Sequence, residues 1–439
     1  MRSLSRALAA IAATAILAGA CTGATTQPSA TPGGASPSAA SAAPASPAPS
    51  AQAEDVTLTY FTFSAAPDHL EDLDAIVQAF EQKHPNISIE VQTAAYADYF
   101  TKLQTQVAGG SAPDTFELNY ENSVAYANSG ALLDLTPLAA GDSDFDPSVY
   151  YPKAYEVFSA DGKQFGVPEQ FSDVVLFYNK DLFDAAGVAY PDASWTWTDE
   201  QAAAEQLTDK ANGIWGHFQP IQFFEFYKVL AQNGGSFFNE DQTKSTFNDA
   251  KGVEAAEWLI GKLDKTMPSD AFGPDQDSAL FKSGKLAMWH TGIWLFSALA
   301  DAPFTWDISV EPGNVQKAHH FFANAVVASA STEHPAEAWA WLRFLTSSDE
   351  AVKVRLDASW ELAAVADQSL FAPYLSQTPP ENREAVFEAL SDIVTPPVIE
   401  QQQQMQDIVT QALEKARLGQ VSVPDALNEA ATQVDALLQ

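Results

Sequence analysis

The chain has 439 residues, of which 46% are hydrophobic and 18% charged, a composition typical of a folded protein rather than a disordered one. A chain of this length can form two domains, each with its own hydrophobic core. The formal net charge of −35 makes nucleic acid and anionic lipid head groups unfavourable partners. Because Cys21 is the single cysteine, the chain can form neither an internal disulfide nor a zinc cluster of cysteines.

The first twenty residues, 1–20, have the layout of a secretory signal peptide, in which Arg2 and Arg6 precede an apolar stretch and small residues lead to Cys21. Ending in a cysteine, the segment resembles a bacterial lipoprotein signal, with the departure that Ala18 stands where leucine is usual. This resemblance implies that the cysteine is acylated and anchors the protein to a membrane. The alternative is an ordinary signal peptide with an incidental cysteine.

Residues 21–55 consist mostly of Ala, Ser, Pro, Thr and Gly, which cannot build a hydrophobic core, and we expect them to form a disordered tether. No later segment approaches the ~20 uninterrupted apolar residues of a membrane-spanning helix. A tether behind a lipid anchor would hold a folded domain a short distance from a membrane.

From Val56 onward the sequence alternates between strand and helix patterns. Apolar strand patterns occur at 56–61, 87–91 and 115–118, and helix patterns occur between them at 70–80 and 96–107. This order implies an α/β protein in which a parallel sheet is joined by right-handed crossovers.

The centre of the chain is predicted to pass from one part of the protein to another. An apolar strand at 174–178 is followed by Asn179, which opens a short helix, and by Gly187 in the C-cap position. Thr198 with Asp199 is expected to cap the next helix.

These central residues resemble the extracellular solute-binding proteins that feed ABC sugar importers, a family related to maltose-binding protein. The resemblance is carried by Gly-Val-Pro at 166–168, Phe-Tyr-Asn-Lys-Asp-Leu-Phe at 177–183, and a second signature at 280–294 that contains a Gly-Lys turn and a Gly-x-Trp. It covers roughly Val56 to Leu438. It implies a two-lobed periplasmic-binding-protein fold of type II, with a ligand cleft between lobes joined by hinge segments.

The same resemblance sets the lobe boundaries. It places the N-terminal lobe at residues 56–165 and 320–365, and the C-terminal lobe at residues 166–319 and 366–439.

Motifs of the common enzyme classes are missing from the sequence, which contains no nucleophile elbow, zinc-protease motif, phosphate loop or dinucleotide-binding motif. His319 and His320 could ligate a metal, but neighbours on a strand point to opposite faces. We therefore expect no enzyme activity, no metal and no cofactor. The paired carboxylates of a glycoside hydrolase remain an alternative, because their separation cannot be derived from sequence.

Ten Trp, twelve Tyr and twenty-seven Phe residues favour a sugar site. Sugar rings stack on flat aromatic side chains, and their hydroxyls bind carboxylates and amides. The candidate residues follow strand ends or belong to the segments that resemble the family. They are Phe63, Ser64, Tyr96, Glu117, Asn119, Tyr120, Glu169, Gln170, Trp289, Trp294, Trp360 and Glu361.

Trp294 is the leading candidate, because Gly292 leaves room for a ligand and the matching tryptophan of the family lies in the cleft. The alternative is a core tryptophan. For the polar candidates the alternative is a solvated surface group.

The resemblance implies a monomeric substrate-binding component of an ABC importer. It would capture a sugar or oligosaccharide by hinge closure and deliver it to a membrane permease from the outer face of the cell membrane. Alternatives are a secreted glycoside hydrolase, a binder of glycerol phosphate or polyamine, and a sensor partner of a membrane kinase. The candidate loops are acidic and aromatic, whereas a phosphate requires Arg, Lys or a helix N-terminus.

Overall fold

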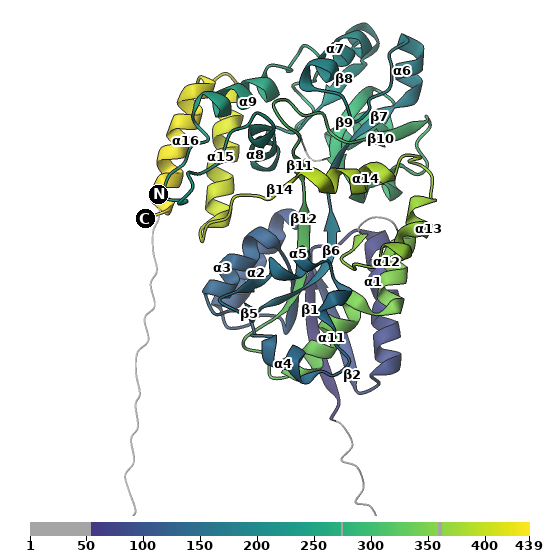
Figure 1. Ribbon diagram of the computed structural model, residues 1–439, viewed down its shortest axis with the longest axis vertical. Coiled ribbons are helices and arrows are strands. Elements are labelled where there is room, and N and C mark those ends of the chain that lie inside the picture. Colours follow the sequence, from purple (N-terminus) through teal and green to yellow (C-terminus); the bar gives the residue numbers. More distant parts are fainter. Residues whose placement is uncertain (1–53, 274, 359–361) are drawn as a thin grey trace, which may run out of the picture. The chain divides into compact units, whose positions relative to one another are not determined.

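The computed structural model describes residues 54–273, 275–358 and 362–439 (Figure 1). The expected signal peptide, Cys21 and nearly all of the expected tether lie outside these residues, as do Trp360 and Glu361. Within the described ranges, no helix combines the length and the apolar character needed to cross a membrane.

A six-stranded sheet forms the centre of the first lobe, with the spatial order β13-β6-β12-β3-β1-β2. Its strands are β1 (Val56–Thr62), β2 (Ile87–Thr93), β3 (Thr115–Asn119), β6 (Gly166–Ser172), β12 (Phe322–Ala328) and β13 (Leu362–Ala363). Strand β1 pairs in parallel with β2 and with β3, which confirms the parallel arrangement predicted for the first three strands. Strand β12 is antiparallel to both of its neighbours, β3 and β6.

Helices cover both faces of this sheet (Figure 1). They are α1 (Pro67–Lys83), α2 (Tyr96–Ala108), α3 (Tyr120–Asn128), α11 (Pro335–Ser347) and α12 (Asp349–Ala358). The three-to-four-residue spacing of apolar residues in α1 places Phe80 in the core, where its ring lies 5.1 Å from that of Trp341 in α11. On the α2 side, the ring of Tyr99 stacks on Phe61 of β1 at 4.4 Å. Helices α1 and α2 are therefore held by burial of one apolar face, whereas the buried residues of α3 are the polar Glu121, Asn122 and Ser123.

A four-stranded sheet with the order β10-β7-β9-β8 forms the centre of the second lobe. Its strands are β7 (Val174–Asn179), β8 (Trp215–Phe218), β9 (Leu286–Gly292) and β10 (Trp306–Ser309). Strand β7 is buried along its whole length, which explains its continuous apolar sequence. A Cβ on Gly216 of β8 would lie 2.2 Å from the carbonyl oxygen of Ala204, so this strand–helix contact requires glycine.

The helices of the second lobe come from two separate parts of the chain. They are α6 (Lys180–Ala186), α7 (Trp197–Leu207), α8 (Phe223–Gln232), α9 (Ala250–Ile260), α10 (Gln276–Lys282), α14 (Glu384–Ala389), α15 (Gln402–Arg417) and α16 (Val423–Leu437). The last two helices pack against each other and against α9, as Figure 1 shows.

The sequence places a lobe boundary at residue 166, whereas strand pairing places all of β6 in the first sheet. The chain therefore passes to the second sheet at Asp173, directly between β6 and β7. The return passage lies between β11 (His319–His320), which pairs with β14 (Ile393–Val394), and β12. The two crossing strands β6 and β12 are hydrogen-bonded neighbours (Figure 1).

Helix-end predictions at the centre of the chain are partly confirmed. Gly187 ends α6 with a φ of 67°, a left-handed conformation that glycine adopts without strain. The prediction that Thr198 is an N-cap is wrong, because α7 already begins at Trp197 and its N-cap is Thr196. Asp199 is the third residue of the helix, and it accepts a hydrogen bond from the backbone N–H of Thr196 at 2.9 Å.

Candidate ligand-binding site

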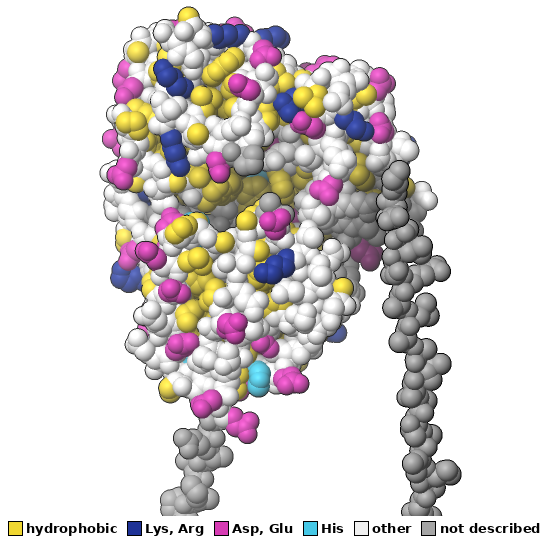
Figure 2. Space-filling view, turned by 180° about the vertical axis from the view of Figure 1, so that it is seen from behind, with side chains coloured by type: hydrophobic (Ala, Val, Ile, Leu, Met, Phe, Trp, Pro, Cys, Tyr) yellow, Lys and Arg dark blue, Asp and Glu magenta, His cyan; other side chains and the backbone are white. Residues whose placement is uncertain are grey.

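A cavity of about 530 Å³ is lined by residues of both lobes and of the two crossing strands. This volume lies within the range of roughly 300–1,000 Å³ that is usual for small-molecule sites. In the space-filling view, hydrophobic side chains gather along a hollow across the middle of the molecule (Figure 2). The cavity therefore has a largely apolar lining and lies where movement of one lobe relative to the other would change its shape.

The first lobe contributes residues from the carboxyl ends of its parallel strands, the usual ligand-facing edge of an open α/β sheet. Phe63 and Ser64 follow β1, Tyr96 begins α2 after β2, and Asn119 ends β3. The rings of Phe63 and Tyr96 meet edge to face, with centroids 5.2 Å apart. Tyr96 is 47% exposed, so its ring offers an aromatic surface to a ligand.

A short hydrogen-bond chain fixes the polar groups of this wall. The side-chain amide of Asn119 donates to Glu121 Oε1 at 2.6 Å and to the Tyr96 hydroxyl at 3.3 Å. The side-chain amide of Asn122 in turn donates to Oδ1 of Asn119 at 2.8 Å, which fixes the orientation of the Asn119 amide. Burial raises the pKa of Glu121 to about 7, so its protonation changes near neutral pH.

The opposite wall carries a second aromatic group. The half-buried ring of Trp294 lies 6.1 Å from that of Phe322 at the start of β12, and Phe322 meets Phe224 edge to face at 5.8 Å. Aromatic surfaces from both lobes therefore face the same cavity, the arrangement expected of a site for the apolar faces of sugar rings.

Gly292 has a different role from the one predicted. A Cβ at this position would lie 1.9 Å from Cζ3 of Trp294, so the space left by the glycine is filled by the indole of Trp294. The glycine allows the tryptophan to fold back at the end of β9. It does not leave room for a ligand.

Polar groups of the second lobe also reach the cavity. Asp277 lines it, and its carboxylate accepts hydrogen bonds from the backbone N–H of Ser278 at 2.8 Å and from Trp289 Nε1 at 3.2 Å. Burial raises the pKa of Asp277 in spite of these bonds. None of the described residues lining the cavity is lysine or arginine, so the lining suits neutral hydroxyl groups better than phosphate.

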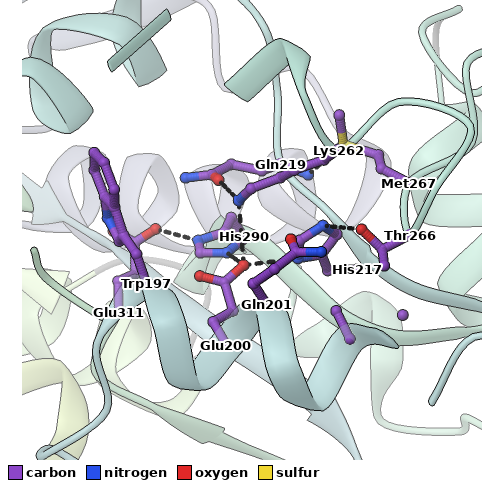
Figure 3. Close-up of polar contacts among 12 residues, drawn as sticks. Trp197, Glu200, Gln201, His217, Gln219, Lys262, Thr266, Met267, His290 and Glu311 are labelled. Carbon is purple, nitrogen blue, oxygen red and sulfur yellow. Dashed lines mark hydrogen bonds and ion pairs between the residues drawn. The ribbon is translucent and has the colours of Figure 1, made fainter. Parts of the chain in front are cut away.

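Beneath this wall lies a buried ion network, part of which, around Glu200 and His290, is drawn in Figure 3. Two of its members, Glu225 and His290, also line the cavity. His290 Nδ1 lies 2.7 Å from Glu311 Oε1, and its Nε2 lies 3.1 Å from Glu200 Oε1. Lys228 bridges Glu225 and Glu311. All five side chains are at most 3% exposed.

The network continues under helix α7 (Figure 3). Glu200 also binds Lys262 Nζ at 3.3 Å and His217 Nδ1 at 2.8 Å. The other ring nitrogen of His217 lies 3.0 Å from the Thr266 hydroxyl. Lys262 donates to Gln219, whose amide in turn donates to Glu225. The cavity wall is thus held by hydrogen bonds from several elements of the second lobe.

Protonation of the two histidines follows from their partners. Burial alone would lower the pKa of His290, but Glu200 and Glu311 outweigh it and raise that pKa above its ordinary value. Both ring nitrogens of a charged imidazole are donors, which matches two carboxylate partners. Burial, helped by Lys262, lowers the pKa of His217 to about 4, so this ring is neutral at pH 7.

Glu225, His290 and Glu311 come close enough together to hold a metal ion. However, Lys228 already places a positive charge between the two carboxylates, and both nitrogens of His290 face carboxylate oxygens. The donor set is therefore occupied by the protein's own cations and fits a metal ion poorly.

Five of the predicted residues come together at the cavity, namely Phe63, Ser64, Tyr96, Asn119 and Trp294. Glu117, Glu169 and Gln170 do not line it, because they are buried in the first lobe. There Gln170 donates to Glu117 Oε1 at 2.9 Å, while Arg355 donates to Glu169 and to Gln170. These three side chains form a buried polar network around an arginine.

Two further candidates also lie away from the cavity lining. Trp289 is buried in β9 and positions Asp277 from behind, and half-buried Tyr120 lies 6.5 Å from the ring of Phe158. Trp360 and Glu361 are outside the described residues.

The candidate list omits several cavity residues that the structure adds. They are His69, Glu121, Ser172, Val174, Pro220, Gln222, Phe224, Glu225, Asp277, His290, Thr291, His320, Phe322 and Asn324. The sequence carries one signal for His290. Side chains alternate along a strand, so His290 of β9 must point to the face opposite that of its buried neighbour Trp289. Glu225 and Asp277 lie in helices and carry no local signal of a ligand site.

Comparison with known proteins identifies the family and the fold. Residues 66–352 match the family described as bacterial extracellular solute-binding protein. An ABC substrate-binding protein from Listeria monocytogenes, solved in complex with cycloalternan, is 47% identical with a TM-score of 0.84, covering 87% of this chain and 99% of that one. The maltodextrin-binding protein MdxE of Bacillus subtilis is 24% identical over 300 residues, which are 66% of this chain and 70% of that protein.

The GacH receptor of Streptomyces glaucescens, solved unliganded and with acarbose, shares the fold, with a TM-score of 0.78 and 20% identity over 88% of this chain and 98% of that one. The type II periplasmic-binding-protein fold expected from the sequence is thereby confirmed. With a family match over more than half of its length, this chain belongs to the bacterial extracellular solute-binding proteins.

Proposed function

We propose that this protein captures an oligosaccharide by closure of its two lobes and delivers it to the membrane permease of an ABC importer. The observation that carries the proposal is the cavity itself, where Tyr96 of one lobe and Trp294 of the other face the same space. Carboxyls at its edge, and the lack of lysine and arginine among the described lining residues, suit neutral hydroxyl-rich rings.

Cycloalternan is the first ligand to test, since the Listeria protein solved with it is 47% identical over nearly its whole length. A ligand that touches both lobes favours the closed arrangement by the difference in its affinity for the closed and open states. The crossing strands β6 and β12 are the segments about which the lobes would move.

The remaining sequence-based expectations complete this proposal. Acylation of Cys21 would anchor the protein at the outer face of the cell membrane, with residues 22–55 as a tether. The protein would act as a monomer and would bind its sugar without cleaving it, so a secreted glycoside hydrolase is the competing function.

Thermal unfolding of the purified protein, with and without ligand, tests the proposal. A ligand at a hundred times its dissociation constant stabilises the folded state by about 2.7 kcal/mol. We expect such a shift with cycloalternan or a malto-oligosaccharide, and none with glycerol 3-phosphate or spermidine. Shifts only with the last two would overturn the sugar assignment. Appearance of shorter sugars during long incubation would assign the protein to the hydrolases.

A substitution in the cavity tests whether the sugar-induced thermal shift arises from binding there. Trp294→Ala should abolish the sugar-induced shift, because it removes an aromatic wall. The half-buried position of this side chain predicts a much smaller effect on the unliganded protein.

A further inference from the structure

Next to the central cavity lie two smaller hollows, of about 320 and 440 Å³. The first hollow shares Tyr96, Gln222 and Phe224 with the cavity. The second hollow shares five residues with the first: Phe100, Thr101, Asn122, Gln403 and Asp407. Hollows that share lining residues lie next to each other, so we call the two smaller hollows together the side groove, which adjoins the cavity at Tyr96, Gln222 and Phe224.

This side groove lies between helices of different lobes. One wall is formed by α2 and α3 of the first lobe, and the other is formed mainly by the start of α15 and the residues just before it (Figure 1). Helix α15 also contacts α3 directly. A ligand in the groove would therefore contact both lobes, as a ligand in the central cavity does.

An aromatic ridge leads from the cavity into the groove. The ring of Tyr96 meets Phe63 edge to face at 5.2 Å on the cavity side, and it meets Phe100 edge to face at 5.5 Å on the groove side. Tyr126 adds a further ring to the groove lining. Successive sugar rings could therefore stay in contact with aromatic surface along the whole path.

The polar lining of the groove is rich in side-chain amides, which both donate to and accept from hydroxyl groups. Gln104, Asn122 and Gln222 lie in it, together with the glutamine run 401–404. None of the described groove residues is lysine or arginine. Glu400 and Asp407 add carboxylates to this lining, so the groove continues the chemistry of the cavity, with amides and carboxylates beside aromatic rings.

Gln406 supplies an independent sign of a missing partner. Its side chain lines the groove, the residue is only 8% exposed, and its Nε2 has no hydrogen-bond partner among the described residues. Leaving a buried amide donor unpaired costs free energy, which a ligand hydroxyl would recover. By contrast, the amide of Gln403 donates to Asp407 at 2.9 Å.

We propose that the side groove is a second part of the sugar site, which binds the further rings of a neutral oligosaccharide whose first rings fill the central cavity. The inference rests on the proposed function and narrows its substrate class to sugars longer than those the central cavity alone can hold. In this proposal Gln406 hydrogen-bonds only to sugars that are long enough to enter the side groove.

Isothermal titration calorimetry with linear malto-oligosaccharides of two to seven rings, and with cycloalternan, tests this inference. We expect affinity to rise with chain length beyond the shortest sugar that binds. Gln406→Leu should weaken the longest sugar about tenfold, the effect of one hydrogen bond to a buried amide, and leave the shortest binder within about twofold. Gln411→Leu changes an exposed glutamine of α15 that lies outside the groove, so it is the matched control and should change neither.

Phe100→Leu is a second variant, in case Gln406→Leu disturbs α15. It removes the groove end of the aromatic ridge and should also weaken only the longer sugars. Equal affinity at all lengths, or an unchanged longest sugar in both variants, would overturn the side groove and leave the central site standing. Failure of every sugar to bind the unmodified protein would instead overturn the proposed function, and the groove with it.

Discussion

Replacement of Lys228 by methionine tests whether the buried ion network holds the second lobe together. Lys228 is fully buried and bridges Glu225 and Glu311, which are themselves buried. Burial alone would lower the pKa of Lys228, but these two carboxylates raise it, so the lysine is charged at neutral pH. Methionine keeps much of the side-chain volume and removes the charge together with the hydrogen-bond donors of the ammonium group.

The expected cost is large because Glu225 loses its ion-pair partner and Glu311 keeps only His290, all within the buried interior. Breaking a buried ion pair from one side typically costs 3–5 kcal/mol, a sizeable part of the 5–15 kcal/mol by which folded proteins are stable. Lys353→Met is the matched control, since Lys353 pairs with Asp357 in an exposed i,i+4 arrangement with side chains 73% and 56% exposed. Such pairs contribute only about 0.3–0.5 kcal/mol.

Urea unfolding of both variants and of the unmodified protein gives the free energies of unfolding. Far-UV circular dichroism and tryptophan fluorescence should be recorded together, because lobes that unfold separately would produce different transitions. If Lys228→Met costs no more than about 1 kcal/mol beyond Lys353→Met, the network is not a source of stability. Adding Glu225→Gln to Lys228→Met should restore part of the loss, because Glu225 is the carboxylate that loses its ion-pair partner, whereas Glu311 still pairs with His290.

Three further predictions concern the cavity wall and the network behind it. Gly292→Ala should displace the indole of Trp294, because the new Cβ would overlap it. We expect calorimetry to show at least a tenfold loss of sugar affinity, with little change in the far-UV circular dichroism spectrum. Unchanged affinity would show that sugar binding does not depend on the position of the indole. His290 has a raised pKa in the folded state, so its stabilising effect is fully present below its unfolded pKa of ~6.5 and is lost as pH rises through the folded pKa. The difference in unfolding free energy between the protein and His290→Gln should therefore shrink as pH is raised above 6.5, and a difference that grows would contradict the network. His217, with its pKa lowered to about 4, should show the opposite trend, losing stability as pH falls from 6.5 towards 4.

Sequence patterns predicted the elements and the strand ends well, because both depend on local periodicity. Phe63, Tyr96 and Asn119 were found by the rule that ligands bind beyond the carboxyl ends of parallel strands, and all three line the cavity. The expected lobe boundary at residue 166 was less reliable. Sequence does not show which sheet a strand such as β6 will pair with.

The role of each acidic residue could not be derived from sequence, because it depends on distant partners. Glu117 and Glu169 lie at strand positions typical of a ligand-binding site. Glu169 instead pairs with Arg355, 186 residues later in the chain, in the interior of the first lobe. Glu121, two residues beyond the end of β3, reaches the cavity. Pairing with residues far away in the sequence thus determines which glutamates lie in the interior and which line the cavity.

The two walls of the cavity are built differently, and this bears on how a ligand would close the lobes. On the second lobe, Glu225 and His290 are fixed by a network whose charges and hydrogen bonds are shared with helices and strands behind them. On the first lobe, Tyr96 is half exposed, and its hydroxyl accepts one long hydrogen bond from Asn119. A preorganised wall binds with little entropy cost, whereas a half-exposed ring loses more of its remaining side-chain freedom when a ligand covers it. We therefore expect the second lobe to set the orientation of the first sugar ring. Tyr96, which stands between the cavity and the side groove, would then be ordered as the lobes close over the rest of the ligand.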